Sequence, residues 1–337
     1  MNLENAKYNR FALVREMLET SDVIGKFDPE CGAAWADSLS QANRIFFTGE
    51  GSSRIFPAKR AMYEAMKTGF PLPMATEGAT QALEYDLGKH AVLAASNSGK
   101  TKEVVRLFKK LQEKSHPHCY SVMAHAGAPL AALSKQAHVL GCGAENAVAA
   151  TKSVAEQALF YQAVLAKMQK RSLGSLQPIA NAVKVALESP IPSDFTTAIA
   201  KAPVIYFSGR NDGVAEELTL KTNEITRKKS AFLEGTYAVH GIEEVMNPDE
   251  VVILIDPFPE EEEKFSQVLK AGVGMKVIAI SSRDTSFPTF KIPSVKNFDE
   301  YIQLAAGWNL LVEVGIQIGI DLDKPVRARK VGNEFMG

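Results

Sequence analysis

A short run of small polar residues between two apolar segments has the composition of an anion-binding loop. The run is Ser96-Asn97-Ser98-Gly99-Lys100-Thr101. It follows an apolar strand-like segment, residues 91–95, and precedes residues 102–111, whose apolar side chains recur at helical spacing. Hydroxyl groups cap free amides at a helix start, and the positive end of the helix favours an anion. The spacing therefore predicts a phosphate site, with simple helix capping by Ser98 or Thr101 as the alternative.

A second group of residues could carry acid–base chemistry. Glu217, Lys221 and Glu224 are spaced i, i+4 and i+7, so they share one face of a predicted helix. Taken alone, such a series is often a solvated Glu–Lys ladder on an exposed helix. His240-Gly241 follows in a predicted loop, where a lone histidine is usually structural. The basic segment 323–331, which contains Lys330, is by itself compatible with a solvated surface segment.

The elements that position these residues alternate between strand and helix. A strand is predicted to run from residue 44 into a Gly- and Ser-rich turn that ends at residue 53. Further strands are predicted at 72–75, 91–95, 119–123 and 139–141, and a long helix is predicted at 149–170. The pattern begins again after residue 172: Ile45 and Ile205, Gly49 and Gly209, and Ser96 and Asp256 all differ by 160 positions. A constant offset indicates an internal duplication. We therefore predict an α/β protein with two tandem doubly wound parallel-sheet domains.

The two predicted repeats differ after their third strand. The first has the hydroxyl-rich loop, whereas the second has Asp256-Pro257-Phe258-Pro259-Glu260-Glu261. An acidic loop would repel an anion. The sequence thus predicts one phosphate site per chain, in the first repeat, at the carboxyl ends of its strands.

Composition narrows the class of protein. The chain has 337 residues, a formal net charge of −1 and 46% hydrophobic residues, without the basic bias expected for nucleic acid or membrane binding. Three cysteines and six histidines show no metal-ligand spacing, and the odd number of cysteines suits free thiols in a reducing cytoplasm. No apolar run approaches the ~18 residues of a membrane helix, and the polar start argues against secretion. We expect a cytoplasmic protein without metal or cofactor.

Together these segments resemble the sugar isomerase (SIS) family, in particular the double-SIS isomerase half of glutamine–fructose-6-phosphate amidotransferase. That resemblance implies a flavodoxin-like fold for each repeat. The family's Cys-Gly-Thr-Ser and Ser-Gln-Ser-Gly-Glu-Thr loops match Glu50-Gly51-Ser52-Ser53 and the 96–101 loop. Its Val-Ala-Ser-Thr-Lys segment matches Val148-Ala149-Ala150-Thr151-Lys152. The substrate-binding residues implied are Glu50, Ser52, Ser53, Ser96, Asn97, Ser98, Thr101, Ala149, Lys152 and Glu217.

The resemblance also implies roles for a catalytic group. The family's Glu/Lys/Glu helix, His-Gly loop and Asp-x-Pro tail match the 217–224 segment, His240-Gly241 and Asp323-Lys324-Pro325. Glu224 would move a proton between C1 and C2 of the open-chain sugar, and His240 would open the ring. Lys221 would stabilise enediolate charge or shuttle the hydroxyl proton. Lys330 would polarise the carbonyl or form an imine. The family's histidine comes from the neighbouring subunit, which implies a homodimer.

The implied organisation has four parts. Residues 1–40 form a helical arm that packs on the first domain, 41–172 the phosphate-binding domain, 173–322 the catalytic domain, and 323–337 a tail over the active site. Four positions depart from the family. Tyr237 replaces its usual Glu, and Ile242 replaces a Pro. Glu50 replaces the Cys and places an extra carboxylate near the sugar, and Lys100 replaces an acid of the phosphate loop. The chain opens Met1-Asn2-Leu3 without a glutaminase cysteine, so we do not expect synthesis of glucosamine phosphate from glutamine.

Three functions follow from this resemblance. The first is a stand-alone phosphosugar isomerase or amino-sugar-phosphate deaminase, for example on glucosamine 6-phosphate, since both reactions use the same enediol or enamine chemistry. The second is a deglycase that cleaves a fructosamine 6-phosphate. The third belongs to another class, a sugar-phosphate sensor without turnover. The expected partner is a phosphorylated sugar or amino sugar, and neither nucleic acid nor membrane.

Overall fold

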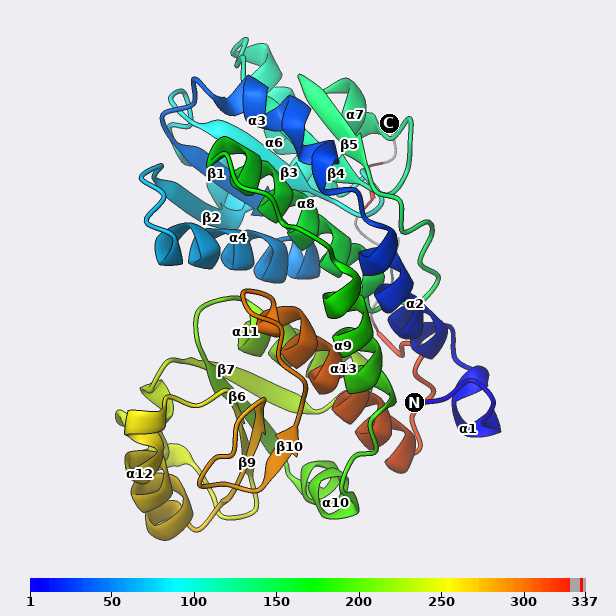
Figure 1. Cartoon of the computed structure of the whole chain (residues 1–337), viewed down its shortest axis with the longest axis vertical. Helices are drawn as coiled ribbons and strands as arrows, with labels where there is room; N and C mark the ends of the chain where they lie inside the picture. Colours follow the sequence, from blue (N-terminus) through cyan, green and yellow to red (C-terminus); the bar gives the residue numbers. More distant parts are fainter. Residues whose placement is uncertain (328–333, 336–337) are drawn as a thin grey trace. The chain divides into compact units, whose positions relative to one another are not determined.

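A computed structural model describes residues 1–327, 334 and 335 of the chain (Figure 1). Contacts divide it into two compact units. The first-sheet unit comprises residues 23–145 and 150–176 together with 334 and 335, and the second-sheet unit comprises residues 1–22, 146–149 and 177–327. Each unit is built around its own five-stranded sheet.

The first sheet is parallel throughout and has the order β2-β1-β3-β4-β5. Its strands are β1 (Ile45–Gly49), β2 (Met74–Gly78), β3 (Ala91–Ala95), β4 (Cys119–Met123) and β5 (Gln136–Val139). The residues of β1, β3 and β4 are all buried, as expected for strands that helices cover on both faces. This order is that of the flavodoxin-like doubly wound fold, in which ligands bind where the strand order reverses, at the β1/β3 ends.

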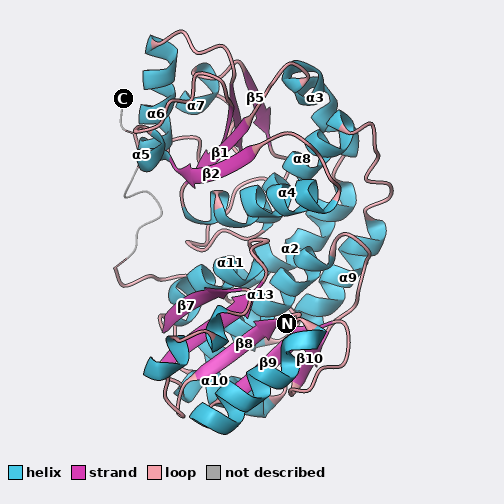
Figure 2. Cartoon of the chain, turned by 90° about the vertical axis from the view of Figure 1, so that its left-hand side faces the viewer, coloured by secondary structure: helices cyan, strands magenta, loops and turns pink. Residues whose placement is uncertain are grey.

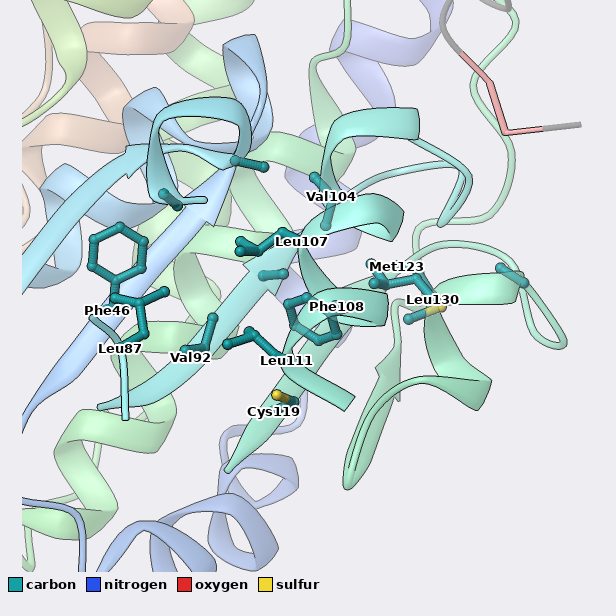
Figure 3. Packing of buried hydrophobic residues seen from close by; sticks show 14 residues of the cluster. Phe46, Leu87, Val92, Val104, Leu107, Phe108, Leu111, Cys119, Met123 and Leu130 are labelled. Atoms are coloured by element: carbon teal, nitrogen blue, oxygen red, sulfur yellow. The ribbon is translucent and has the colours of Figure 1, made fainter. Parts of the chain in front are cut away.

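Helices cover both faces of the first sheet (Figure 2). They are α3 (Ala33–Leu39), α4 (Ile55–Lys67), α5 (Ala79–Ala82), α6 (Lys102–Glu113), α7 (Pro129–Ala132) and α8 (Lys152–Met168). Figure 3 shows one core: Leu107 and Phe108 of α6 pack against Phe46 of β1 and Val92 of β3. This packing fixes the start of α6, and with it the 96–101 loop, at the end of β3.

The second sheet repeats the topology of the first, with the order β10-β9-β8-β6-β7. Its strands are β6 (Val204–Gly209), β7 (Lys229–Glu234), β8 (Val251–Ile255), β9 (Lys276–Ser281) and β10 (Thr289–Lys291), and all of them pair in parallel. Strands β3 and β8 retain the 160-residue offset at both ends. The predicted fold class, two doubly wound domains related by duplication, is confirmed.

The helices of the second-sheet unit are α1 (Ala6–Asn9), α9 (Gln177–Glu188), α10 (Ser193–Lys201), α11 (Val214–Lys221), α12 (Glu262–Phe265) and α13 (Asp299–Gln317). Two π-helical segments, Thr222–Thr226 and Ser266–Val273, continue α11 and α12. Helix α13 is buried along most of its length and packs on α9, α10 and α11. Gly307 makes this approach possible, because a Cβ there would lie 2.3 Å from a methyl carbon of Leu218 on α11.

Three local predictions were wrong. The second strand spans Met74–Gly78 rather than residues 72–75, and the fifth spans Gln136–Val139 rather than residues 139–141. The predicted helix that carries Glu217, Lys221 and Glu224 leaves α-helical geometry after Lys221. The N-terminal arm includes α2 (Ala12–Lys26), and residues 1–22 belong to the second-sheet unit.

Candidate functional site

The 96–101 loop joins β3 to α6, as predicted, and its hydroxyl groups are held in a defined arrangement. Ser96 Oγ lies 2.8 Å from Thr101 Oγ1, and Ser96 Oγ also accepts the amide hydrogen of Gly99 at 3.1 Å. Gly99 has φ +64°, and a Cβ on it would lie 2.5 Å from the Cβ of Ala128. Only glycine fits this position.

Simple capping does not explain these hydroxyl groups. Thr101 is the N-cap residue of α6, but its side chain makes no capping hydrogen bond. Ser98 Oγ accepts the amide hydrogen of Lys100 at 3.1 Å, outside the helix. No side chain of the N-cap residue thus occupies the start of this twelve-residue helix, whose dipole would attract an anion, although Glu334 of the tail pairs with Thr101 there.

The loop after β1 brings Glu50, Ser52 and Ser53 to the neighbouring strand end of the same sheet. Ser53 Oγ lies 3.5 Å from Nε2 of Gln157 on α8, and Ser52 is buried. Glu50 accepts the amide hydrogen of Ala79 at 2.9 Å, at the start of α5. Partial burial raises the pKa of the Glu50 carboxyl above its ordinary value, although this hydrogen bond acts in the opposite direction.

The segment before α8 supplies two further predicted residues. Lys152 is the first residue of α8 and is only 5% exposed, whereas Ala149 is buried within the second-sheet unit. Eight of the predicted substrate-binding residues lie in the first-sheet unit: Glu50, Ser52, Ser53, Ser96, Asn97, Ser98, Thr101 and Lys152.

Glu217, Lys221 and Glu224 form a buried charge cluster in the second-sheet unit. Lys221 Nζ lies 3.3 Å from Glu217 Oε1 and 2.7 Å from Glu224 Oε2. The side chains of Lys221 and Glu217 are 0% exposed, and that of Glu224 is 25% exposed. The solvated-ladder alternative is therefore wrong. A buried cation between two carboxylates, one of which reaches solvent, is typical of a functional site.

The charge state of Lys221 follows from its neighbours. Burial alone would lower its pKa, but the charges of Glu224 and Glu217 outweigh burial, so the pKa lies above the ordinary value for lysine. Lys221 is therefore an ammonium ion at neutral pH. An ammonium ion can stabilise negative charge on a reacting oxygen, but it cannot act as a nucleophile or accept a proton. This favours charge stabilisation over the proton shuttle among the two roles predicted for Lys221.

A π-helical turn places Glu224 differently from Glu217 and Lys221. Residues Thr222–Thr226 are π-helical, and such turns are frequent at functional sites. Two threonine hydroxyl groups stabilise the turn, Thr222 by donating to the Leu218 carbonyl oxygen and Thr226 by donating to that of Thr222. The spacing i, i+7 predicted one face, but the wider turn moves Glu224 away from the strict helical position.

Arg227 ends this turn in the left-handed conformation, with φ +56°. Its Nη2 donates to the carbonyl oxygens of Asp321 and Lys324. The turn that carries Glu224 is therefore tied to the chain that leads toward Lys330. Lys330 itself lies outside the described residues.

The Asp-x-Pro tail has a structural contact that the sequence did not predict. Asp323 accepts the amide hydrogens of Ala12 at 2.6 Å and Leu13 at 2.9 Å, so it caps the start of α2. Further along the tail, the amide of Phe335 donates to the carbonyl oxygen of Lys100 at 2.8 Å. The tail thus contacts the 96–101 loop near its end.

His240 follows a short 3-10 turn (Tyr237–Val239) and is exposed. Its Nε2 lies 3.1 Å from Nζ of Lys264, and Tyr237 beside it is 51% exposed. The imidazole is thus accessible to solvent, as a group that acts on a substrate of another subunit would need to be.

The second sheet has no open loop at the position that corresponds to Ser96. Asp256 follows β8 with φ +42°, accepts from Ser281 Oγ at 2.9 Å, and accepts from Arg210 at 3.1 Å. Arg283 lies 3.9 Å from the same carboxylate. The predicted acidic loop therefore lies beside two arginines from other segments, and the carboxylate of Asp256 pairs with both.

Sequence reasoning missed Glu145 and Arg227, because each acts through a tertiary contact that leaves no periodic pattern. In the described part of the chain, no group of three or more His, Cys, Asp or Glu side chains is arranged to hold a metal ion. Within the same residues, every helix is too short or too polar to cross a lipid bilayer.

The fold and these two groups of residues define an α/β protein with two flavodoxin-like sheets, one followed by a hydroxyl-rich loop at a helix start and the other by a buried carboxylate–lysine cluster. Residues 38–167 match the model of the SIS domain, which identifies this part of the chain as an SIS domain. No curated protein sequence matches the chain significantly.

Solved structures share this fold along nearly the whole chain. The C-terminal domain of glucosamine-fructose-6-phosphate aminotransferase from Francisella tularensis superposes with a TM-score of 0.77 at 17% identity, covering 94% of this chain and 98% of that one. Tagatose-6-phosphate ketose/aldose isomerase from Escherichia coli gives a TM-score of 0.73 at 18% identity, covering 96% and 99%. Glucosamine-6-phosphate deaminase from Thermotoga maritima also gives 0.73 at 18% identity, covering 96% and 99%. The predicted resemblance to phosphosugar isomerases and deaminases is confirmed at the level of fold.

Proposed function

We propose that this protein is an enzyme, a phosphosugar aldose–ketose isomerase or amino-sugar-phosphate deaminase that acts through an enediol or enamine. The observation that carries the proposal is the cluster of Glu217, Lys221 and Glu224, in which the ammonium group is buried and Glu224 reaches solvent. Solved structures with the same fold include enzymes named for both reactions.

In this proposal the two groups of residues act on one substrate. The 96–101 loop and the serines after β1 bind the phosphate, and Glu224 removes a proton from one carbon and returns it to the next. Lys221 stabilises the oxyanion that forms meanwhile. His240 of a second copy opens the sugar ring, so the active enzyme is a homodimer in which the subunits share each site.

The C-terminal tail, residues 323–337, supplies the last residue of the proposed site, Lys330. Arg227 and Asp323 hold the segment that leads to Lys330, and Phe335 contacts the phosphate loop. We assign Lys330 to the substrate carbonyl, where it polarises the oxygen or forms an imine. Three free cysteines support a reducing, cytoplasmic location.

A deglycase that cleaves a fructosamine 6-phosphate is the second candidate. Glu50 favours it, because its carboxylate is exposed at the β1 end of the sheet and could pair with a substrate amine. Deglycase and deaminase both act on amine-bearing sugars, so Glu50 supports either over an isomerase of neutral sugars.

The experiment is a panel of hexose, hexosamine and fructosamine 6-phosphates, with mass detection of isomers, ammonia and amino acids. Glu224→Gln should reduce turnover of the active substrate by at least about a hundredfold while leaving its binding intact. Glu260→Gln, which removes an exposed carboxylate from the same unit, is the matched control and should be fully active. Full activity of Glu224→Gln would refute the assignment of the base. A wild type that binds sugar phosphates without turning any over would instead be a sensor.

A further inference from the structure

Glu145 is a buried carboxylate that joins two parts of the first-sheet unit. It is 7% exposed and lies in the loop between β5 and α8. Its Oε1 accepts the amide hydrogen of Thr151 at 2.8 Å and that of Ser153 at 3.3 Å, at the start of α8. Its Oε2 accepts from Ser153 Oγ and, at 3.0 Å, from Nδ2 of Asn97 in the 96–101 loop.

The bond to Asn97 determines how that side-chain amide is oriented. An ionised carboxylate has no hydrogen to donate, so it must face the NH2 group of asparagine and not the amide oxygen. Asn97 Oδ1 then points away from Glu145. It is buried and has no hydrogen-bond partner among the described residues. Buried polar atoms without a partner are rare, and such an atom at a ligand site marks a bond that the ligand or a water completes.

We infer that Glu145 is a positioning residue of the candidate site, which orients the Asn97 amide so that Oδ1 accepts a hydrogen bond from the substrate. The donor must carry a hydrogen, so it is a hydroxyl or ammonium group of the sugar and not an oxygen of the phosphate dianion. This inference rests on the proposed function and refines it. Asn97 then hydrogen-bonds to the sugar part of the substrate, whereas the neighbouring hydroxyl groups bind the phosphate.

The variant Glu145→Gln isolates this role. The glutamine oxygen can replace Oε1 and keep the bonds to the start of α8, and its NH2 group can replace Oε2 next to Ser153, whose hydroxyl can accept as well as donate. The bond to Asn97, in contrast, becomes donor against donor. Asn97 must turn its amide, and its oxygen then accepts from the glutamine NH2 group and is lost to the substrate.

The readout is the ratio of two affinities measured by calorimetry. D-glucitol 6-phosphate has the phosphate ester and the sugar hydroxyl groups, whereas methyl phosphate has the ester alone. We expect Glu145→Gln to weaken binding of D-glucitol 6-phosphate about tenfold, with methyl phosphate changed less than about twofold. The double variant Asn97→Asp/Glu145→Gln should restore the ratio, because Asp at 97 accepts from the glutamine NH2 group and presents its other oxygen to the ligand.

Equal weakening of both ligands would overturn the inference, since Glu145 would then only hold α8 in place. Unchanged binding of both ligands would overturn it as well. The amide orientation is tested without any ligand by the Asn97 side-chain NH2 signals in ¹H–¹⁵N spectra, identified by their loss in Asn97→Ser. These signals should shift in Glu145→Gln, and unshifted signals would refute the bond. If the wild-type protein binds both ligands with equal affinity, the proposed sugar-phosphate substrate is refuted. The spectra would still decide how the Asn97 amide is oriented.

Discussion

Replacing Lys221 by methionine removes the cation that two carboxylates share inside the second-sheet unit. With an effective dielectric constant of about 20, Coulomb's law gives roughly 5 kcal/mol of attraction across the 3.3 Å between Lys221 and Glu217. Desolvation offsets much of this attraction, and breaking a buried ion pair by removing one partner costs about 3–5 kcal/mol. We expect Lys221→Met to lower the free energy of unfolding of this unit by that amount at pH 8.

The loss should depend on pH, because Glu217 stays buried without its cation. Burial raises the pKa of a carboxyl group, so in Lys221→Met the folded state binds a proton more tightly than the unfolded state. Stability of the variant therefore falls as pH rises above the ordinary pKa of glutamate, about 4.3. The deficit relative to wild type should be larger at pH 8 than at pH 5. In the wild type the raised pKa of Lys221 acts in the same direction but at higher pH: its contribution to stability is complete below about pH 10.4 and is lost as pH rises above that value.

The assay is urea denaturation followed by circular dichroism at pH 5 and pH 8. Lys270→Met, at an exposed lysine of the same unit, is the matched control and should lie within about 0.5 kcal/mol of wild type. The double variant Glu217→Gln/Lys221→Met should recover part of the loss, because it leaves no buried charge without a partner. The buried charge cluster would be refuted if Lys221→Met lost the same free energy of unfolding at both pH values. It would also be refuted if that loss were no larger than the loss in Lys270→Met.

Three further predictions concern the loops and the tail. Gly99→Ala should weaken binding of methyl phosphate at least about tenfold in calorimetry, because the added Cβ clashes with Ala128 and alanine is strained at φ +64°; unchanged affinity would place the anion elsewhere. Asp323→Asn should lower stability by about 1 kcal/mol, seen as a lower thermal midpoint, because α2 loses its charged cap; an unchanged midpoint would contradict the capping role. Asp256→Ser should free Arg210, so calorimetry should find a second equivalent of bound sulfate per chain; a single equivalent would contradict this explanation of the asymmetry.

The sequence predicted the central strands well and the edge strand poorly, for one physical reason. Strands β3 and β4 are buried on both faces, so they appear as continuous apolar runs whose limits are sharp. Strand β2 lies at the edge of its sheet and none of its residues is fully buried, so Met74–Gly78 carries almost no hydrophobic pattern. The helix predicted for Glu217, Lys221 and Glu224 changes to π-helical geometry at Thr222, and periodicity alone cannot detect that change.

The candidate site was predictable where its residues are local in sequence. The 96–101 loop could be placed between a strand and a helix because its neighbours on both sides have clear patterns. Glu145 could not, since its contact with Asn97 joins positions 48 residues apart and depends on the tertiary structure. The burial of Lys221 was likewise invisible, because the same spacing occurs on exposed helices.

The two repeats show why a duplicated fold needs only one anion site. Both sheets bring a loop to the same strand end, where parallel sheets bind ligands. In the first sheet that loop presents the hydroxyl groups of Ser96 and Thr101 and an uncapped helix start. In the second, the carboxylate of Asp256 accepts from Ser281 and Arg210. A carboxylate attached to the chain has an effective concentration on the order of millimolar or more, which a free phosphate in the cell would have to exceed. We therefore expect the second sheet to exclude anions because the Asp256 carboxylate already pairs with the arginine, and not because the loop repels them. Helix α11 of this sheet can then carry the buried carboxylates and lysine.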